Sequence, residues 1–353
     1  MSPRVKGAVL GLSAAALFGI SAPVAKLLLP SSTPLVLASL LYLGGGLGLT
    51  CLEGLRRLRP SGAPAREARL GRKDVPPLLG VILCGGILGP VLMLVGLQRL
   101  SGVAASLLLN LEGPFTILLA LLVFGEHLGR AGALAAGFVL AGASVLGFQE
   151  GELHGDVLGV LALAGACLSW AVDNNLTQRL SLKDPLALVR IKALGSGTCT
   201  LVVAWLTSQP FPIGRVWGSA LVLGFASYGL SIVLDAYALR LLGAAREAAY
   251  FATAPFVGAL VAVPLLGERL RPLDLLAGAL MAMGVVLLLR ERHGHVHTHA
   301  ALEHEHLHVH DAHHQHAHPP GTNPTEPHSH PHQHAPLTHD HPHVSDLHHR
   351  HKH

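Results

Sequence analysis

Histidine is the residue type whose spacing most directly suggests chemistry in this chain. The sequence holds 25 His residues, and all but two lie between His293 and His353, mostly at every second position. Neutral imidazole is a good ligand for Zn(II), Ni(II), Co(II) and Cu(II), and residues at i and i+2 of an extended chain project to the same side. We therefore predict that this segment binds divalent metal ions. The predicted ligands are His293, His295, His297, His299, His304, His306, His308, His310, His313, His314, His316, His318, His328, His330, His332 and His334.

The residues between these His clusters predict a disordered tail over residues 293–353. Pro and polar residues fill the gaps, and hydrophobic residues are rare. Such a segment cannot bury enough apolar surface to offset the entropy lost when its chain becomes ordered. Because each bound ion must also order this chain, we expect modest affinity and several exchanging sites.

A second group of candidates consists of polar side chains inside long apolar stretches, where each ionisable group is costly. Glu112 lies near the middle of such a stretch, two residues after Asn110 and directly before Gly113–Pro114. Proline removes a backbone donor and frees a carbonyl group, so a carboxylate at this point resembles an ion or substrate site. The alternative is a protonated Glu112 that bonds to a neighbouring helix.

Asp173, Asn174 and Asn175 are consecutive polar residues in another apolar stretch. On a helix they point in three directions about 100° apart, so they cannot all face one cavity. Some of them must therefore bond to neighbouring helices. We predict that Asp173 and Asn174 line a pathway, with a structural role for Asp173 as the alternative.

Other charged residues lie closer to the ends of apolar stretches. Arg190 and Lys192 either snorkel to the membrane surface or supply one cation that pairs with Asp173 or Asp235. Lys26 and Asp235 are either pathway residues or interfacial groups. The predicted pathway set is Glu112, Asp173, Asn174, Asn110, Asp235, Lys26 and Arg190.

Helices must position these residues, because apolar runs of about 20 residues, long enough to cross a bilayer, recur along the chain. Backbone groups in lipid must be satisfied within their own segment, which favours helices. The loops are too short to hold a soluble domain. The ten predicted spans are Gly7–Leu29, Leu35–Leu55, Val75–Leu97, Val103–Phe124, Ala131–Phe148, Asp156–Leu176, Pro185–Leu206, Trp217–Leu239, Glu247–Leu266 and Leu273–Leu289.

The Lys and Arg residues near the span ends predict the orientation, because these residues concentrate on the cytoplasmic side. With a cytoplasmic N-terminus, sixteen of them lie on the cytoplasmic side and four on the other side. An even number of spans then places the tail in the cytoplasm as well. We predict a protein integral to the cytoplasmic (inner) membrane, with both termini in the cytoplasm.

Composition excludes several classes of protein. Hydrophobic residues make up 50% of the chain and charged residues only 13%, whereas soluble domains have about 25% charged residues. We therefore expect neither a soluble enzyme nor a nucleic-acid binder, and no nucleotide-binding or hydrolase motif occurs in the sequence. The four Cys residues lie in apolar stretches without a CxxC pair, which indicates small core residues rather than disulfides or a zinc site.

Two parts of the sequence share landmarks. Gly113–Pro114–Phe115 precedes Gly125–Glu126, and Ala254–Pro255–Phe256 precedes Gly267–Glu268, with 12 and 13 residues from Pro to Glu. Two copies of five spans each would run in opposite directions across the bilayer, an arrangement typical of transporters with a substrate site between the halves. We therefore predict a first five-helix repeat over residues 1–149, a second over residues 150–292, and the tail over residues 293–353.

The stretch from Asn110 to Thr116, followed by Gly125–Glu126, resembles the fourth-span pattern of the EamA-type family in the drug/metabolite transporter superfamily. The second copy resembles the ninth span of that family, with Thr253 at the place of Glu112. Further matches are Phe18–Gly19 and Lys26 to the first span, and Ser169–Trp170–Ala171 to the sixth span.

The resemblance covers about residues 7–289. It implies an all-α membrane protein with ten transmembrane helices in two inverted five-helix repeats. It also implies secondary transport of small metabolites, often outward. The sequence departs from the family pattern at Asp173–Asn174–Asn175 and in the His-rich tail.

Three functions are compatible with these features. The first is a secondary-active exporter of a small polar metabolite with a metal-binding cytoplasmic tail. The second is a divalent transition-metal transporter whose tail collects or senses the ion. The third, a membrane-anchored metal store, would not need so many spans. No cofactor is expected to be required. The expected partners are the lipid bilayer, the small-molecule substrate and metal ions at the tail, with no nucleic acid and with a homodimer left open.

Overall fold

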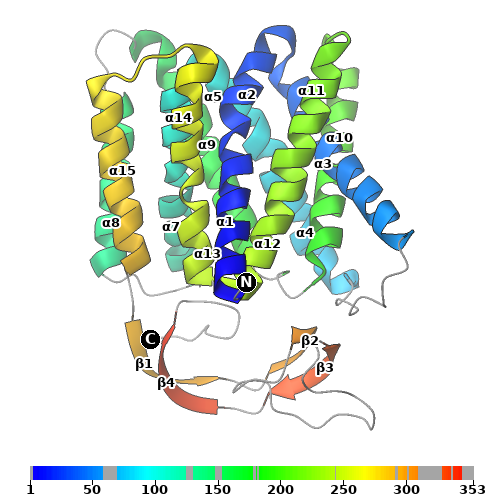
Figure 1. The fold of residues 1–353 in the computed structure, drawn as a ribbon, viewed down its shortest axis with the longest axis vertical. Coiled ribbons are helices and arrows are strands. Elements are labelled where there is room, and N and C mark those ends of the chain that lie inside the picture. The colour runs from blue at the N-terminus through cyan, green and yellow to red at the C-terminus, as the bar shows by residue number, and fades with distance from the viewer. Residues whose placement is uncertain are drawn as a thin grey trace.

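The computed structural model shows a bundle of upright helices with short strands beyond one end (Figure 1). It describes residues 3–58, 70–124, 130–147, 153–177, 180, 183–242 and 244–290, together with four strands after residue 292. Each predicted span coincides with one helix or with a series of helical segments. These segments are α1 (Pro3–Gly19), α2 (Ser21–Leu28), η1 (Leu29–Ser31), α3 (Pro34–Arg57), η2 (Arg72–Asp74), α4 (Val75–Val81), η3 (Ile82–Leu88), α5 (Gly89–Arg99), α6 (Gly102–Leu108), η4 (Leu109–Leu111), α7 (Glu112–Phe124), α8 (Arg130–Gly147), α9 (Leu153–Thr177), α10 (Pro185–Leu206), α11 (Arg215–Gly224), η6 (Phe225–Leu230), α12 (Ser231–Leu242), α13 (Ala244–Phe251), α14 (Ala254–Leu266) and α15 (Pro272–Arg290).

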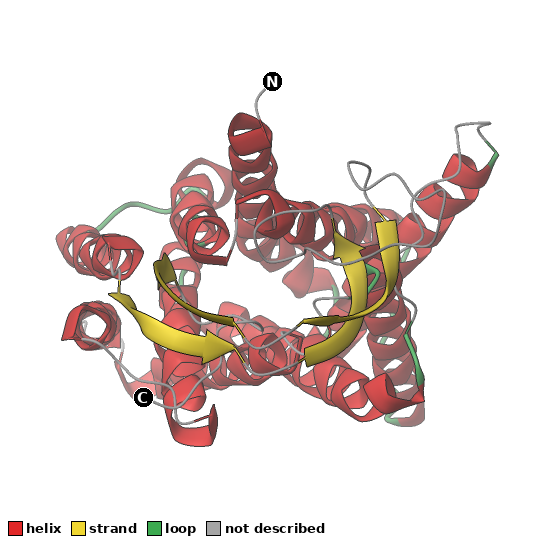
Figure 2. Ribbon diagram, turned by 90° about the horizontal axis from the view of Figure 1, so that it is seen from below, coloured by secondary structure: helices red, strands yellow, loops and turns green. Residues whose placement is uncertain are grey.

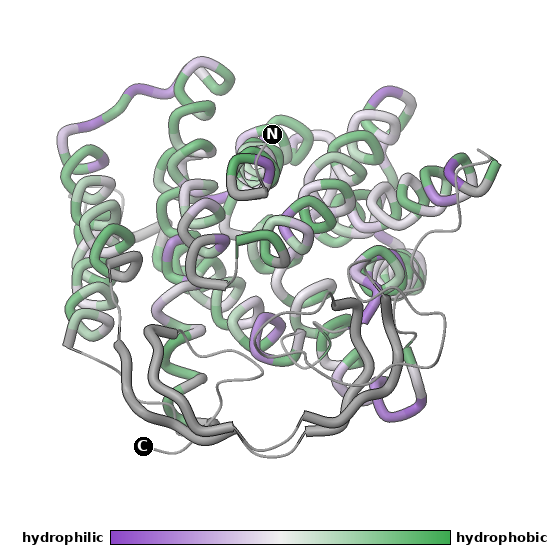
Figure 3. The backbone as a smooth tube through the Cα atoms, turned by 60° about the horizontal axis from the view of Figure 1, so that its bottom comes forward, coloured by the Kyte–Doolittle hydropathy of each residue, from purple (hydrophilic) through white to green (hydrophobic). Residues whose placement is uncertain are grey.

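Seven helices in the described part of the chain are long and apolar enough to cross a membrane. Three shorter apolar helices, Ala131–Leu146, Ala254–Leu266 and Pro272–Leu287, lie at the predicted fifth, ninth and tenth spans. Figure 3 shows hydrophobic residues along most of the helices, with many of the hydrophilic residues near helix ends and loops. This distribution is typical of a membrane protein, in which apolar side chains also face the lipid.

In the described part of the chain, the first span breaks at Ile20, between α1 and α2, and four further spans contain irregular turns. The π-helical segments η3 and η6 interrupt the third and eighth spans. The fourth span passes through the 3-10 segment η4 directly before Glu112, and the ninth span breaks at Ala252–Thr253, directly before α14. The irregular turns of the third and fourth spans thus have counterparts in the eighth and ninth spans.

Helix packing joins the two halves of the chain. α3 packs along α10, α8 along α15, α1 along α12, α5 along α9, and α6 along α14, and the α8–α15 pair is visible at the left of Figure 1. Two glycines permit a reciprocal close approach of α3 and α11. A Cβ atom on Gly44 would collide with the backbone of Leu221, and one on Gly224 would collide with the backbone of Leu41.

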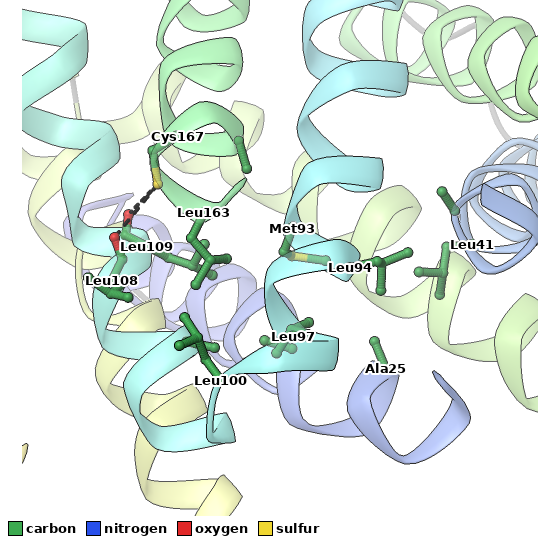
Figure 4. Close-up of a cluster of buried hydrophobic side chains, with 14 of the residues drawn as sticks. Ala25, Leu41, Met93, Leu94, Leu97, Leu100, Leu108, Leu109, Leu163 and Cys167 are labelled. Atoms are coloured by element: carbon green, nitrogen blue, oxygen red, sulfur yellow. Dashed lines mark hydrogen bonds between the residues drawn. The ribbon is translucent and has the colours of Figure 1, made fainter. Parts of the chain in front are cut away.

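The apolar core lies between these packed helices. Figure 4 shows part of it, with Met93 and Leu97 of α5 beside Leu163 of α9. Cys167 is buried there, with its Sγ atom 3.7 Å from the carbonyl oxygens of Leu108 and Leu109.

The prediction that the Cys residues are core residues is therefore right for Cys167 but wrong for two others. Cys51 and Cys199 are exposed, Cys84 is half-buried, and all four are free thiols. The physical reason is that a membrane helix presents apolar side chains to lipid as well as to its neighbours. Apolar sequence neighbours therefore do not imply burial inside the protein.

Two antiparallel ribbons lie beyond the end of the bundle at which α1 begins and α15 ends (Figures 1 and 2). β1 (His293–His299) pairs with β4 (Leu337–His343), and β2 (Leu302–His308) pairs with β3 (His328–His334). The prediction of a wholly disordered tail is wrong for these residues. The physical reason is that alternation of His with other residues matches the two-residue period of a β-strand.

Candidate functional site

Glu112 is the first residue of α7, directly after the irregular turn η4. Asn174 of α9 is exposed and donates from Nδ2 to Oε1 of Glu112 over 2.7 Å. This hydrogen bond joins a residue of the first half of the chain to a residue of the second half. The structure thus brings together two residues that the sequence predicts for a pathway.

Asp173 points to a different helix from Asn174. It is buried, with an exposed fraction of 5%, and forms an ion pair with Lys192 of α10. Oγ1 of Thr177 donates a second hydrogen bond to Oδ1 of Asp173 over 3.1 Å. Of the two cations considered for this role, Lys192 and not Arg190 therefore pairs with Asp173.

Asn175 takes the third direction. Its Nδ2 atom donates to the carbonyl oxygen of Ala171 over 2.9 Å and lies 3.4 Å from the carbonyl oxygen of Thr116 on α7. The three consecutive polar residues thus serve three purposes: Asp173 holds α10, Asn174 reaches Glu112, and Asn175 bonds within α9 and toward α7.

The π-helical segment η3 lies close to Asp173 at Gly85. The carbonyl oxygen of Gly85 accepts from the Tyr42 hydroxyl over 2.7 Å and from Nε1 of Trp170 over 3.1 Å. A Cβ atom on Gly85 would collide with the carboxylate of Asp173. π-helical turns frequently mark functional sites, and here the turn exposes a carbonyl group and leaves room for a charged side chain.

Aromatic side chains from both halves of the chain border this region. The ring of Phe18 lies 6.2 Å from that of Trp170 and 5.9 Å from that of Tyr228, measured between centroids. Tyr228 also lies 5.2 Å from Tyr42. Aromatic faces can attract a cation or stack on a flat organic group, so this border can contact an organic substrate.

A second pair of carboxyl groups lies on α12 and α13. Asp235 and Glu247 interact electrostatically with each other. Glu112 interacts electrostatically with Asp173, Lys192 and Asp235, and Glu247 interacts electrostatically with Glu112. The central polar cluster, defined as Glu112, Asp173, Asn174, Lys192, Asp235 and Glu247, therefore draws on five helices.

Sequence reasoning missed Glu247 as a site residue. Glu247 stands at the start of the predicted ninth span, where an acidic residue is usually interfacial. The only signal in the sequence is a second acidic residue on the next helix after Asp235. Tyr42, a lone hydroxyl group within an apolar span, was missed for a similar reason.

Three residues of the predicted pathway set have contacts outside the cluster. Lys26 donates from Nζ to the carbonyl oxygens of Leu97, over 3.0 Å, and of Leu100, where a cation stabilises the C-terminal end of α5. Arg190 forms an ion pair with Glu53 of α3. Asn110 is buried and donates from Nδ2 to the carbonyl oxygen of Leu107 over 2.9 Å.

Sequence comparison decides the family. The EamA-like transporter family matches the chain twice, over residues 5–148 and over residues 157–290. The chain belongs to this family. The resemblance inferred from the motifs around Glu112 is thereby confirmed.

Two individual comparisons agree with this membership. An uncharacterized transporter from Methanothermobacter thermautotrophicus is 29% identical over 300 residues, which cover 81% of this chain and 86% of that protein. A crystal structure with 21% sequence identity covers 80% of this chain and 94% of its own, with a TM-score of 0.57. At that identity the structural likeness shows the fold alone. The EamA-like chain is thus an integral membrane protein of a transporter family, which points away from an enzyme.

The Gly–Glu landmark of the second half has a structural role in this EamA-like transporter. Glu268 follows α14, and its carboxylate accepts from the backbone N–H groups of Gly102, over 2.6 Å, and Val103, over 2.9 Å. An anion at the N-terminal end of α6 satisfies helix donors that have no partner within the helix. The landmark therefore links the ninth span to the start of the fourth.

Among the side chains that the structure describes, no group of three or more His, Cys, Asp or Glu residues has the geometry of a metal site. The predicted tail ligands fall into two sets. Those in β1, β2 and β3 have described backbones. Those outside the described residues are His310, His313, His314, His316 and His318. His154 lies in the first turn of α9.

Proposed function

We propose that this EamA-like protein is a secondary-active transporter that exports a small polar metabolite. The observation that carries the proposal is the central polar cluster, in which Glu112 of the first half meets Asn174 of the second half. Charged groups inside membrane spans are costly and usually serve transport. Substrate sites of transporters with internal repeats lie at the interface of the two halves.

We also propose that ten helices form two inverted five-helix repeats, as the sequence predicts. The double match of the family, over residues 5–148 and 157–290, supports this arrangement. The cross-half helix pairs and the irregular turns at corresponding positions support it as well. Two halves that rock against each other around a central site would give alternating access.

Charge balance suggests the chemical class of the substrate. The cluster contains four carboxyl groups, in Glu112, Asp173, Asp235 and Glu247, and one cation, Lys192, which is already paired with Asp173. Glu112 remains partly exposed beside Asn174. A metabolite with an ammonium or guanidinium group would complement this excess of acidic groups, with the neighbouring aromatic rings as a further contact.

The tail is proposed to bind divalent metal ions in the cytoplasm. The strand register supports this, because it places His295 opposite His341 and His297 opposite His339. Directly opposed residues of an antiparallel pair have Cβ atoms about 5 Å apart, a separation that suits two ligands of one ion. β2 and β3 repeat the pattern, with His304 opposite His332 and His306 opposite His330.

The tail also favours a second candidate function, in which the transported substrate is itself a divalent transition metal. A path for the ion through the membrane would then have to rely on carboxylates, because no His lies in the central part of a described span. In this case the tail would deliver ions to the inner end of the bundle.

A liposome assay tests the two functions directly. The purified full-length protein is reconstituted and offered a panel of amino acids, diamines and divalent metal ions, with and without a proton gradient. We expect gradient-driven movement of a cationic organic compound, and loss of that movement in Glu112→Gln. Movement of Zn(II), Ni(II) or Co(II) alone would replace the metabolite function with the metal function.

A truncation after Arg292 tests the tail separately. Zinc bound per protein at pH 7.5 should fall to nearly none, while transport of an organic substrate should persist. Metal binding by the full chain should weaken from about pH 7 to about pH 5.5, because protonated imidazole cannot bind a metal and free His titrates near 6.5. Unchanged zinc binding in the truncated chain would contradict a metal-binding tail.

The predicted location is the cytoplasmic membrane with both termini in the cytoplasm. The structure places the start of α1 and the end of α15 at one end of the bundle (Figure 1). A reporter that works only outside the cytoplasm should stay silent when it is fused after His353. Strong reporter activity would reverse the proposed orientation.

A further inference from the structure

The first ribbon of the tail carries its paired His residues on one face. Successive residues of a strand alternate between its two faces, and directly opposed residues of an antiparallel pair share a face. The face without His carries Val296 opposite Asp340 and Thr298 opposite Thr338. On the other face, three His pairs stand in a row: His293–His343, His295–His341 and His297–His339.

The second ribbon repeats this arrangement with different segments of the chain. Its face without His carries Glu303 opposite Gln333 and Glu305 opposite Pro331. Its three His pairs are His304–His332, His306–His330 and His308–His328. In either ribbon, a shift of the pairing by one residue would place the His residues of the two strands on opposite faces. The observed registers therefore bring the paired His residues of both strands together.

The spacing within each ribbon suits an ion that takes four nitrogen ligands. Opposed residues have Cβ atoms about 5 Å apart, and residues two apart in one strand are separated by about 7 Å. Two adjacent His pairs therefore mark a rectangle whose corners lie about 4 Å from its centre. Zn(II) takes four ligands in tetrahedral geometry, with about 2 Å to each ring nitrogen. Two adjacent pairs can thus share one ion, whereas the two end pairs, about 13 Å apart, cannot.

The middle pair of each ribbon belongs to both possible sets of four His residues. His295–His341 can combine with the pair on either side of it, and His306–His330 can do the same in the second ribbon. Loss of a middle pair leaves only two separated pairs, whereas loss of an end pair leaves one complete set. No such difference is expected if each ion is held by the His residues of a single sequence cluster.

Strand pairing by itself gives the ribbons little stability. An isolated pair of strands is marginally stable in water, and Pro331 and Pro342 each lack a backbone donor. Residues 309–327 separate β2 from β3, and residues 300–336 separate β1 from β4, so each pairing closes a long loop at a cost in chain entropy. The free energy of metal binding to a site that the unfolded chain lacks contributes to folding. An ion shared by two strands would therefore hold a ribbon closed.

We propose that the tail has two metal centres, one on each ribbon, and that each centre takes its four His ligands from two adjacent opposed pairs. The ligand class is a divalent transition-metal ion that accepts four imidazole nitrogens, with Zn(II) as the best match. Each centre joins distant parts of the tail, so binding closes the chain into two nested ribbons. This inference rests on the proposed metal binding by the tail and is independent of the transport function.

Zinc retention by the untagged full-length protein tests the pairing. The protein in detergent is loaded with Zn(II), a competing chelator removes the weakly bound ions, and the retained zinc is counted. We expect His306→Ala with His330→Ala to retain about one ion fewer than the native chain. The matched control, His308→Ala with His328→Ala, removes the same number of His residues from the same strands and should retain as much zinc as the native chain. Comparison with the native chain cancels ions that are held elsewhere in the tail.

The possible results separate the paired centres from the metal-binding tail itself. Equal zinc counts in the two variants would overturn the paired centres, although the tail would still bind metal if the native chain retained more zinc than the truncation after Arg292. Equal counts in the native chain and the truncation would contradict both proposals. These substitutions lie outside the membrane spans, so unchanged helix content by circular dichroism serves as the folding control.

Cross-linking on the face without His provides a second test. Thr298→Cys with Thr338→Cys places two thiols at directly opposed positions, and a short bifunctional maleimide should join them in Zn(II) and much less after chelation. Mass spectrometry of the digested protein identifies the joined peptides. The matched control is Thr298→Cys with Ser329→Cys, because Ser329 lies opposite Leu307 in the other ribbon. Equal cross-linking in the two variants, or cross-linking that does not depend on Zn(II), would overturn the proposal.

Discussion

In the fourth span the irregular turn leads into Glu112, whereas in the ninth span the corresponding turn ends at Thr253. Glu112 faces Asn174 of another helix. The hydroxyl of Thr253 instead donates to the carbonyl oxygen of Tyr250 in its own span, over 2.6 Å. Similar backbone interruptions thus present a carboxylate within the membrane span in one half. In the other half they present a hydroxyl group that is hydrogen-bonded within its own span.

The third and eighth spans differ in a similar way. Both contain a π-helical segment, but Gly85 in the third span makes room for the carboxylate of Asp173. Gly224, directly before the segment in the eighth span, makes room for the backbone of Leu41. We learn from both comparisons that the backbone irregularities set where a contact can form, and that the side chains decide whether it is polar.

Glu112→Gln should have the largest effect of the variants, and this effect should be on transport. The amide keeps the size of the side chain and its hydrogen bond from Asn174 but removes the negative charge, so the protein should fold at near-normal yield. Loss of a buried charge contact costs about 2–5 kcal/mol, so transport of a cationic compound should fall at least about 30-fold in gradient-driven and exchange modes alike. Exchange that survives while gradient-driven transport is lost would instead indicate that Glu112 carries a transported proton.

Lys192→Met should have the next largest effect, on stability rather than on chemistry. It leaves the buried carboxylate of Asp173 without its cation, and removal of one partner of a buried ion pair costs about 3–5 kcal/mol. Denaturant unfolding in detergent measures this loss. The double variant Lys192→Met with Asp173→Asn should recover most of it, and a single variant as stable as the native protein would contradict the ion pair.

Gly85→Ala tests whether the π-helical segment of the third span must leave space for Asp173. The new methyl group would collide with the carboxylate of Asp173, so the carboxylate or η3 must move, at a cost of about 1–3 kcal/mol. Gly218→Ala on α11 is the matched control, because a Cβ atom there meets nothing within 4 Å. Equal unfolding free energies for the two variants would show that Asp173 does not depend on the space at Gly85.

Thr253→Val should have the smallest effect. It removes one hydrogen bond to Tyr250, and a single neutral hydrogen bond contributes about 1 kcal/mol to stability. Transport should stay near the native level, because the hydroxyl serves the backbone of its own span. A loss of transport as large as that in Glu112→Gln would mean that both halves contribute equally to the site.

Much of the helical framework could be predicted from the sequence. Pro185–Leu206 is both a predicted span and the observed helix α10, because a membrane helix needs a continuous apolar run and Asp184 and Pro185 form a clear start signal. Glu112 was also recognisable from the sequence, because it is a single carboxylate among apolar residues, close to a helix-breaking Pro. Such features are local, and hydropathy and backbone chemistry along the chain are sufficient to read them.

The partners of these residues could not be predicted. The spacing of Asp173, Asn174 and Asn175 indicates three directions, but it does not say which helix lies in each direction. The choice of Lys192 over Arg190 as the partner of Asp173, and the meeting of Asp235 with Glu247, depend on how far each helix is shifted along its axis and turned about it. Those two quantities follow from packing between helices.

The sequence alone thus determined the membrane character, the helical spans, the family motif around Glu112 and the density of His in the tail. Tertiary structure decided that Lys26 and Arg190 stabilise helix contacts away from the centre, while Glu247 joins the central polar cluster. The physical reason is that hydropathy depends on each residue in turn. A polar contact, by contrast, depends on the distance between atoms far apart in the chain, and only the packed helices set that distance.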